Sequence, residues 1–292
     1  MHQQATWIEA ALNGPWGRGI QPGIPVAVSE IVADGIACAE AGAAIVHLHA
    51  YDEATGRQKD DWQIYARIID GIRAQHDVIV YPTIPLAGGP DVSKPMTAEA
   101  RFAAVRALAR RKLIEWTVVD PGSVQFSSLA KLAGTDETGF LYENPEGHVR
   151  HGLALCAQEG LHPSYAIYEP GFLRTGAALA GRYGCPAPIY RLMVSDGFSF
   201  GFPPEPWAVD AYLALLRGCT DDAAWMAAGL DVELEPLFGY VIAKGGHIRV
   251  GLEDARFGET RGNRQLVEEA VAAVEASGGR VASSADVRRA LR

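Results

Sequence analysis

Short apolar runs alternate with longer amphipathic stretches along the chain, and this alternation restricts the fold more than any other feature. The apolar runs have the length of strands, whereas the stretches between them place apolar residues at helical spacing. The pattern predicts strands at 6–12, 43–49, 77–83, 114–119, 164–168, 189–194, 223–228 and 247–252. It predicts helices at 26–41, 61–75, 97–111, 147–159, 171–183, 205–218 and 263–276.

Repeated strand–helix units indicate parallel strands joined by helical crossovers. A closed (β/α)8 TIM barrel, forming a single domain over 1–292, is the simplest architecture for eight such units. The alternative is a doubly wound open sheet, which a glycine-rich dinucleotide fingerprint after an early strand would favour, and the sequence has none. The stretch 120–146 is rich in Gly, Ser and Asp, and is expected to be a substrate-covering loop or a surface excursion.

Composition excludes several classes of partner. The formal net charge is -9 at pH 7, which argues against nucleic acid or an anionic membrane as the main partner. The sequence has no apolar run of membrane-spanning length and no secretory signal pattern at its start, so a cytoplasmic location is expected. The cysteines are far apart in sequence and are expected to be reduced thiols: Cys38, Cys156, Cys185 and Cys219.

Two histidines end the second predicted strand. Strand alternation places His47 and His49 on one face, and Leu48 on the other. In a barrel, both imidazoles would project inward near the C-terminal mouth, where barrel enzymes build their active sites. Two imidazoles at this spacing form half of a zinc site, although paired histidines on a strand also serve purely structural roles.

The last predicted strand can complete this site. Arg249 and Glu253 share a face, with Glu253 at the C-terminal end of the strand, where its carboxylate would give a His2Glu metal site. The alternative is that Glu253 caps the next helix or pairs with Arg256. Glu9, on the first strand, becomes a neighbour of Arg249 if the barrel closes, and a buried arginine needs such a partner.

Several blocks together carry a family resemblance. They are AALNG at 10–14, HLHAYDEATGR at 47–57, DPGS at 120–123, GGHIRVGLED at 245–254 and NRQLV at 263–267. On these blocks, the sequence resembles the β-keto acid cleavage enzyme family, whose members include 3-keto-5-aminohexanoate cleavage enzymes. Since the blocks run from the first strand to the final helix, the resemblance covers most of the chain.

The resemblance implies a zinc-dependent TIM-barrel enzyme that is a homo-oligomer, often a tetramer. The implied reaction converts a β-keto acid and acetyl-CoA to acetoacetate and a new acyl-CoA. By motif, His47, His49 and Glu253 become the metal ligands, although another divalent metal could replace Zn²⁺. Asp254 becomes the general base, and Arg249 its partner.

The sequence departs from the family around this core. Loop 82–89 replaces a Ser-Thr-Gly-Gly type turn, and Thr83 is expected to supply the hydroxyl. Val118 stands where a Ser or Thr is usual, with Thr117 on the opposite face, and 164–169 replaces an acidic pair. By position, the candidates for the substrate pocket are Trp16, Tyr51, Thr83, Val118 and Tyr168.

These departures leave two alternatives open. One is a divergent metal-dependent lyase or aldolase on the same site. The other is a barrel metallohydrolase, which would need further histidines on later strands. His148, His151 and His162 fall in predicted helices or loops instead.

Overall fold

The computed structural model describes residues 5–87 and 96–292. Its main sheet has eight strands, all paired in parallel, in the order β5-β2-β1-β12-β11-β10-β9-β6. The end strands β5 and β6 contact each other, so the sheet curls into a nearly closed barrel. The strands are β1 (Ile8–Ala11), β2 (Ile45–Leu48), β5 (Ile79–Pro82), β6 (Trp116–Val118), β9 (His162–Ile167), β10 (Ile189–Val194), β11 (Ala224–Gly229) and β12 (His247–Val250).

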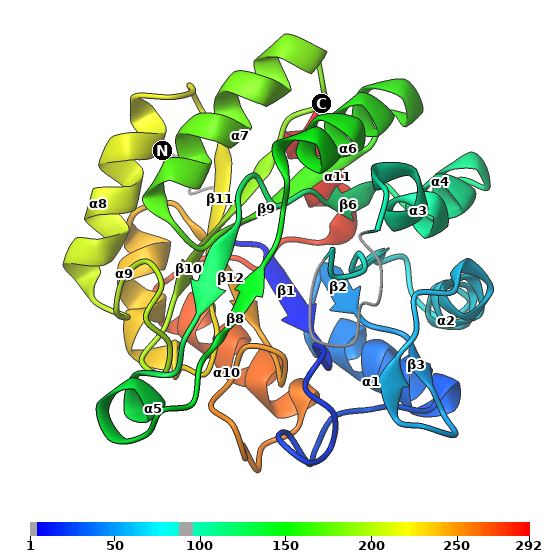
Figure 1. The fold of residues 1–292 in the computed structure, drawn as a ribbon. Coiled ribbons are helices and arrows are strands. Elements are labelled where there is room, and N and C mark those ends of the chain that lie inside the picture. Colours follow the sequence, from blue (N-terminus) through cyan, green and yellow to red (C-terminus); the bar gives the residue numbers. More distant parts are fainter. Residues whose placement is uncertain (1–4, 88–95) are drawn as a thin grey trace.

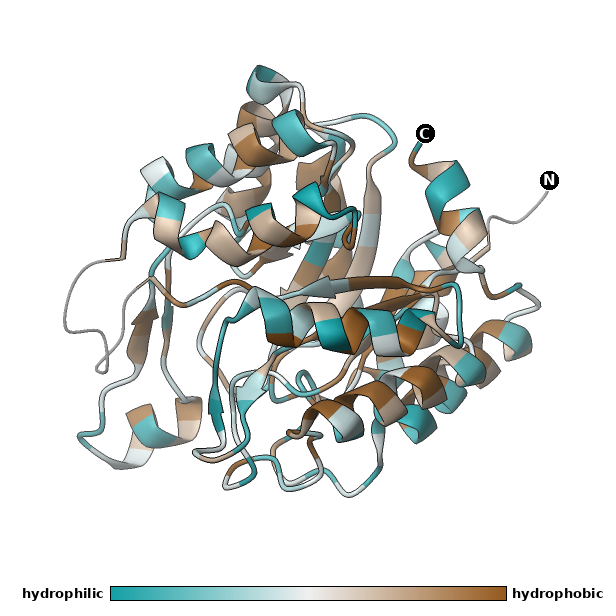
Figure 2. Cartoon of the chain, turned by 90° about the vertical axis from the view of Figure 1, so that its right-hand side faces the viewer, coloured by the Kyte–Doolittle hydropathy of each residue, from teal (hydrophilic) through white to brown (hydrophobic). Residues whose placement is uncertain are grey.

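Helices surround this barrel (Figure 1). They are α1 (Val28–Ala41), α2 (Trp62–Arg73), α3 (Ala98–Arg101), α4 (Ala103–Arg110), α6 (Glu146–Glu159), α7 (Pro170–Tyr183), α8 (Pro206–Arg217), α9 (Phe238–Ala243), α10 (Asn263–Ala276) and α11 (Ser284–Ala290), with a 3-10 turn at Glu235–Leu237. Apolar and hydrophilic residues alternate along them, as expected of helices with one face against the barrel (Figure 2). Within the described residues, no helix is both long and apolar enough to cross a bilayer.

Helix α2 illustrates why these elements form. Its buried residues, Tyr65, Ile68, Ile69 and Ile72, recur at helical spacing and face the sheet. The Asp61 carboxylate accepts a hydrogen bond from the Gln63 N–H and so caps the first turn. The TIM-barrel prediction is therefore confirmed, with each predicted barrel strand present at or near its expected position.

Three predicted elements need correction. The strand at 247–252 ends at Val250, because Gly251 has φ 141°, and a Cβ there would lie 2.1 Å from the Ala11 carbonyl oxygen. The helix at 97–111 is broken at Phe102 into α3 and α4, and this break accompanies burial of the consecutive side chains of Arg101 and Phe102. Strand β9 begins at His162 rather than at 164.

The stretch 120–146 is folded rather than open. It contains an antiparallel hairpin of β7 (Val124–Phe126) and β8 (Phe140–Tyr142), with the short helix α5 (Leu129–Gly134) between the strands. The hairpin lies in front of the barrel strands in Figure 1. A second, smaller hairpin, β3 (Tyr51–Asp52) with β4 (Arg57–Gln58), follows β2. Both hairpins extend the mouth of the barrel, where the candidate site lies.

Candidate metal centre

The two histidines and the distant glutamate meet at the C-terminal end of the barrel. His47 Nε2 lies 3.5 Å from one carboxylate oxygen of Glu253, and His49 Nε2 lies 3.5 Å from the other. One ligand atom from each residue lies within 4.8 Å of the others, and residues 5–87 and 96–292 contain no other such group. Ligand atoms about 3.3 Å apart are expected around a tetrahedral ion with bonds of about 2.0–2.1 Å. The set can therefore hold a metal ion.

The surroundings of His49 leave its metal-facing nitrogen free. Its Nδ1 lies 2.9 Å from Gln58 Oε1, and Gln58 Nε2 donates to both carboxylate oxygens of Asp60 at 3.0 Å. Because a carboxylate only accepts, the Gln58 amide nitrogen must face Asp60 and its oxygen must face the imidazole. His49 therefore carries its proton on Nδ1, and its Nε2 lone pair points toward Glu253.

Buried polar atoms without hydrogen-bond partners at this centre are also consistent with a bound cation. His49 Nε2 and Glu253 Oε2 are buried and have no hydrogen-bond partner among the described residues. Burial lowers the pKa of His47 well below its usual value, so its imidazole is neutral and can bind a metal. Burial also opposes ionisation of Glu253, but the positive charge of Arg249 outweighs this effect and holds the pKa of that carboxyl well below its usual range.

Arg249 organises the acidic groups beside this centre. It donates two hydrogen bonds of 2.8 Å to Asp254 and one of 2.9 Å to Glu9, and it lies 2.9 Å from Glu253. The Tyr81 hydroxyl donates to the same Glu9 oxygen at 2.8 Å. The expected contact between Glu9 and Arg249 is thus present, and Arg249 is compensated by several carboxylates.

Asp254 also faces the cavity, next to Glu253 in the chain. Strand alternation would place these neighbours on opposite faces, but the turn after Val250 lets both line the same cavity. Burial raises the pKa of Asp254, and the nearby charge of Arg249 partly offsets this shift. A buried carboxylate with a raised pKa is better suited to accept a proton than an ordinary surface aspartate.

Gly14 allows the chain to pass close to the metal centre. Its φ is 58°, and a Cβ at this position would lie 2.8 Å from Cγ of Glu253 and 2.9 Å from Nε1 of Trp16. That indole nitrogen donates to the Glu253 carbonyl oxygen at 2.9 Å, and the Tyr51 hydroxyl donates to the Gly14 carbonyl oxygen. Gly14, the last residue of the AALNG block, therefore lies directly against the Glu253 side chain.

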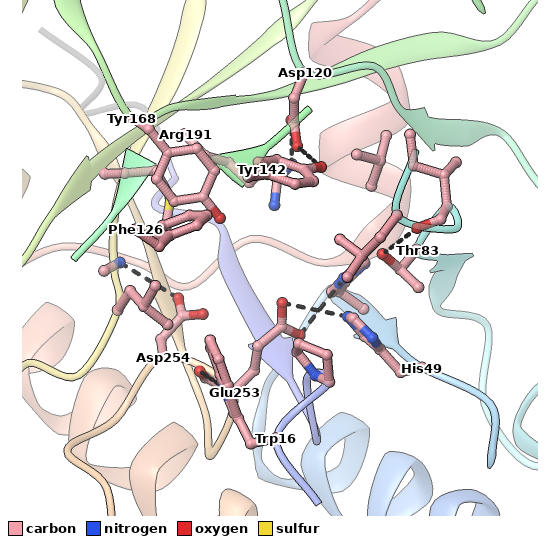
Figure 3. A pocket seen from close by; sticks show the side chains of 18 of the residues that line it. Trp16, His49, Thr83, Asp120, Phe126, Tyr142, Tyr168, Arg191, Glu253 and Asp254 are labelled. Atoms are coloured by element: carbon pink, nitrogen blue, oxygen red, sulfur yellow. Dashed lines mark hydrogen bonds and ion pairs between the residues drawn. The ribbon is translucent and has the colours of Figure 1, made fainter. Parts of the chain in front are cut away.

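The opposite wall of the cavity is aromatic, with one ion pair. Phe126, Phe140 and Tyr142 come from the β7–β8 hairpin, and Tyr168 follows β9. Asp120 and Arg191 lie on the same side as Tyr142, across the cavity from His49 and Glu253 (Figure 3). The space between these walls, including the part that is open to solvent, is about 690 Å³.

Most of the residues proposed by position lie at the site. Trp16, Thr83, Val118 and Tyr168 line the cavity, whereas Tyr51 is buried beside it. The loop that follows Thr83 is described only in part, since Gly88 and Gly89 lie outside the described residues.

Sequence reasoning missed Gln58, Asp120 and Arg191. An arginine in the middle of the apolar strand 189–194 was a usable signal, because such a residue needs a buried partner. His148 and His151 belong to α6, and His162 begins β9 at the N-terminal end of the barrel, so none of them joins the metal centre.

Comparisons with known proteins agree with this picture. Residues 5–292 match the family model described as beta-keto acid cleavage enzyme. The chain is 27% identical over 282 residues to 3-dehydrocarnitine:acetyl-CoA trimethylamine transferase of Rhizobium meliloti (strain 1021), covering 92% of this chain and 90% of that protein. It is 25% identical over 275 residues to the 3-keto-5-aminohexanoate cleavage enzyme of Fusobacterium nucleatum subsp. nucleatum, covering 92% and 91%.

Among solved structures, the binary complex of ObcA with oxaloacetate is similar with a TM-score of 0.68 and 16% identity, covering 92% of this chain and 67% of that one. This likeness shows the fold alone. Fold and site together define a TIM-barrel enzyme with a candidate metal centre at the C-terminal ends of its strands. The match over nearly the whole chain is more specific: the chain belongs to the beta-keto acid cleavage enzyme family.

Proposed function

We propose that this enzyme exchanges acyl groups between a β-keto acid and acetyl-CoA, with a zinc ion held by His47, His49 and Glu253. The observation that carries the proposal is the convergence of unsatisfied His49 and Glu253 atoms beside a buried carboxylate, Asp254. The names of relatives that act with acetyl-CoA support it, as in the transferase of Rhizobium meliloti. A bound divalent ion would act as a Lewis acid toward the keto and carboxylate oxygens of the substrate.

The residues of the chain would carry the proton transfer. Asp254 takes a proton from the methylene carbon between the two carbonyl groups of the keto acid, and Arg249 holds Asp254 in position with two hydrogen bonds. Glu9 fixes the far side of the Arg249 guanidinium. Among the described residues, Thr83 Oγ1 makes only a 3.5 Å contact with the Ile84 carbonyl, so its hydroxyl can bind a substrate oxygen.

The exchange balances without a further reactant. The deprotonated carbon forms a bond with the acetyl carbonyl carbon, and CoA leaves as the thiolate. The thiolate then attacks the original keto carbon, whose bond to the methylene carbon breaks. The methylene carbon recovers a proton, which gives acetoacetate and the new acyl-CoA. We expect the aromatic wall to limit the entry of water into this cavity, which would suppress hydrolysis of the thioester.

Isotope labelling tests the proposal directly. The purified enzyme is incubated with zinc, a panel of β-keto acids and acetyl-CoA carrying ¹³C in its carbonyl carbon. We expect the label in the keto carbon of acetoacetate, together with an acyl-CoA that matches the keto acid. Cleavage of the keto acid without acetyl-CoA would instead indicate a lyase, and release of labelled acetate alone would indicate a hydrolase.

Metal content and assembly state are measured on the same preparation. We expect one zinc per chain by elemental analysis, with loss of activity after chelation and recovery after zinc is added. We also expect a homo-oligomer, a tetramer by resemblance to the family, and light scattering coupled to size-exclusion chromatography measures its mass.

A further inference from the structure

Arg191 is a buried arginine that uses few of its hydrogen-bond donors within the described part of the chain. It lies in the middle of β10, is 3% exposed and lines the cavity. Its Nη2 makes two long contacts, 3.4 Å to Asp120 and 3.3 Å to the Ser164 carbonyl oxygen, and its Nε has no partner among the described residues. Since a guanidinium offers five N–H donors, most of them are available to a ligand.

Asp120 is held mainly by other groups. Its carboxylate accepts a 2.6 Å hydrogen bond from the Ala166 N–H and a 2.7 Å bond from the Tyr142 hydroxyl. Both contacts are shorter than the 3.4 Å contact with Arg191. Asp120 therefore balances the charge of Arg191, which makes its burial tolerable, without occupying the guanidinium.

Arg191 lies within a few side chains of the metal centre. The ring centroids of His47 and Tyr81 are 4.7 Å apart, the Tyr81 hydroxyl lies 3.3 Å from Ser164 Oγ, and Arg191 contacts the backbone of Ser164. Figure 3 shows Arg191 across the same cavity from His49 and Glu253. A substrate held by its keto and carboxylate oxygens at the metal centre would extend its side chain toward Arg191.

The described part of the cavity offers no free carboxylate to a cationic side chain. Glu253 faces the imidazoles, Asp254 is held by two bonds from Arg249, and Asp120 is held by Tyr142 and Ala166. The remaining wall toward Arg191 is apolar or aromatic: Val118, Phe126, Tyr168 and Met193. An ammonium group would lose water there without gaining a counter-ion.

We propose that Arg191 is a specificity-determining residue that binds an oxygen acceptor on the side chain of the keto acid. The preferred substrates are β-keto acids whose side chain carries a carboxylate, carbonyl or hydroxyl oxygen, rather than a plain hydrocarbon or ammonium side chain. This inference rests on the proposed function for the position of the keto acid at the metal centre. The aromatic wall then covers the carbon chain between the two anchors.

A set of six-carbon keto acids tests the proposal. The set contains 3-oxoadipate, 5-hydroxy-3-oxohexanoate, 3-oxohexanoate and 5-amino-3-oxohexanoate, which share a six-carbon chain and differ in the group at C5 or C6. We measure kcat/KM with acetyl-CoA and, without acetyl-CoA, binding to the zinc-loaded enzyme by calorimetry. The native enzyme is expected to favour at least one oxygen-bearing acid over 3-oxohexanoate by about 10- to 100-fold, the range of a charge-assisted hydrogen bond, and to bind the amine worst. The ranking of the carboxylate against the hydroxyl identifies the acceptor.

Variants assign the preference to Arg191. Arg191→Met should remove this preference, because kcat/KM should fall further for the oxygen-bearing acids than for 3-oxohexanoate. The double variant Arg191→Met with Asp120→Asn removes both charges, which avoids an uncompensated buried carboxylate if the single variant folds poorly. Arg264→Met, in the exposed surface of α10, is the matched control and should keep the native ranking.

Two results would overturn the role of Arg191. One is a native preference for the hydrocarbon or ammonium acid. The other is an equal loss for all four acids in the folded variants, which would indicate that Arg191 acts on the thioester or on the scaffold instead. If no acid undergoes acyl exchange, the proposed function fails, and the calorimetric ranking still decides whether Arg191 selects the side chain.

Discussion

The two walls of the cavity differ in how completely their charges are paired. On the metal side, Arg249 is held by Glu9, Glu253 and Asp254 at 2.8–2.9 Å. On the opposite side, the one ion-pair partner of Arg191 in residues 5–87 and 96–292 is Asp120, at 3.4 Å. The first wall is fixed in place before substrate arrives, as a reacting centre requires, whereas the second retains unused donors. We expect this difference to separate the residues that perform the reaction from those that select the substrate.

The walls also come from different parts of the barrel. The metal side comes from β1, β2 and β12, which are neighbours in the sheet. The opposite side comes from β6, β9 and β10 and from the β7–β8 hairpin inserted after β6. Loops and insertions can change without disturbing the barrel strands, so the part of the second wall that comes from the β7–β8 hairpin can vary with the substrate.

Removal of a metal ligand should have the largest effect. We expect His49→Ala to lose zinc and to lower turnover by about 1,000-fold or more, because a Lewis acid supplies several kcal/mol of stabilisation. Elemental analysis and steady-state kinetics measure both losses. His76→Ala, at a partly exposed histidine far from the site, is the control. One equivalent of zinc retained by His49→Ala would contradict the ligand assignment.

Loss of the proposed base, Asp254, should lower turnover without changing the zinc content. We expect Asp254→Asn to keep its zinc and to slow turnover by about 100-fold or more, the scale of a lost general base. The exposed Asp210→Asn should leave both unchanged. If turnover of Asp254→Asn equals that of the native enzyme, Asp254 is not the base.

Loss of the hydrogen bond that orients His49 should have an intermediate effect. Gln58→Leu removes the acceptor of the Nδ1 proton, and we expect zinc affinity to fall by about 10-fold or slightly more. Competition with a chromogenic chelator measures the affinity. Gln265→Leu, on the exposed face of α10, tests for a general effect of the substitution. Equal zinc affinities in the two variants would show that Gln58 does not orient His49.

The smallest effect is expected at Gly14. Gly14→Ala places a methyl group against Glu253 in a left-handed backbone conformation, and we expect a loss of about 1–2 kcal/mol of stability. Thermal unfolding of the zinc-loaded protein measures it. Gly147→Ala, at a helical position with no atom within 4 Å of the added Cβ, should not lower the melting temperature. An unchanged melting temperature for Gly14→Ala would show that the backbone can move away from Glu253.

The barrel could be predicted because its signal repeats. Every strand carries an apolar run and most crossovers carry an amphipathic helix, so an error at one position leaves the pattern intact. The positions where the strands and helices end or break were harder to predict. Nothing in the local pattern at 247–252 shows that Gly251 must pass close to the Ala11 carbonyl, because that contact depends on ring closure. The short helices α9 and α11 are too brief for periodicity to identify.

The site was predictable to the extent that its residues lie in compact motifs. His47 and His49 are two positions apart at the end of β2, and Glu253 lies within the distinctive block 245–254. Asp120 and Arg191 are 71 residues apart and meet only because β6, β9 and β10 are neighbours in the folded sheet. Gln58 acts through an amide orientation that Asp60 decides, and no spacing in the sequence indicates such an orientation.

The pairing of β1 with β12 has a consequence for biosynthesis. Glu9 and Arg249 are 240 residues apart in the chain, and Glu253 follows Arg249 on the same late segment. His47 and His49 therefore leave the ribosome long before Glu253, whose carboxylate completes the proposed metal site. The nascent polypeptide can hold the ion only loosely until its final barrel strand docks, so capture of the metal should coincide with completion of folding and report on it.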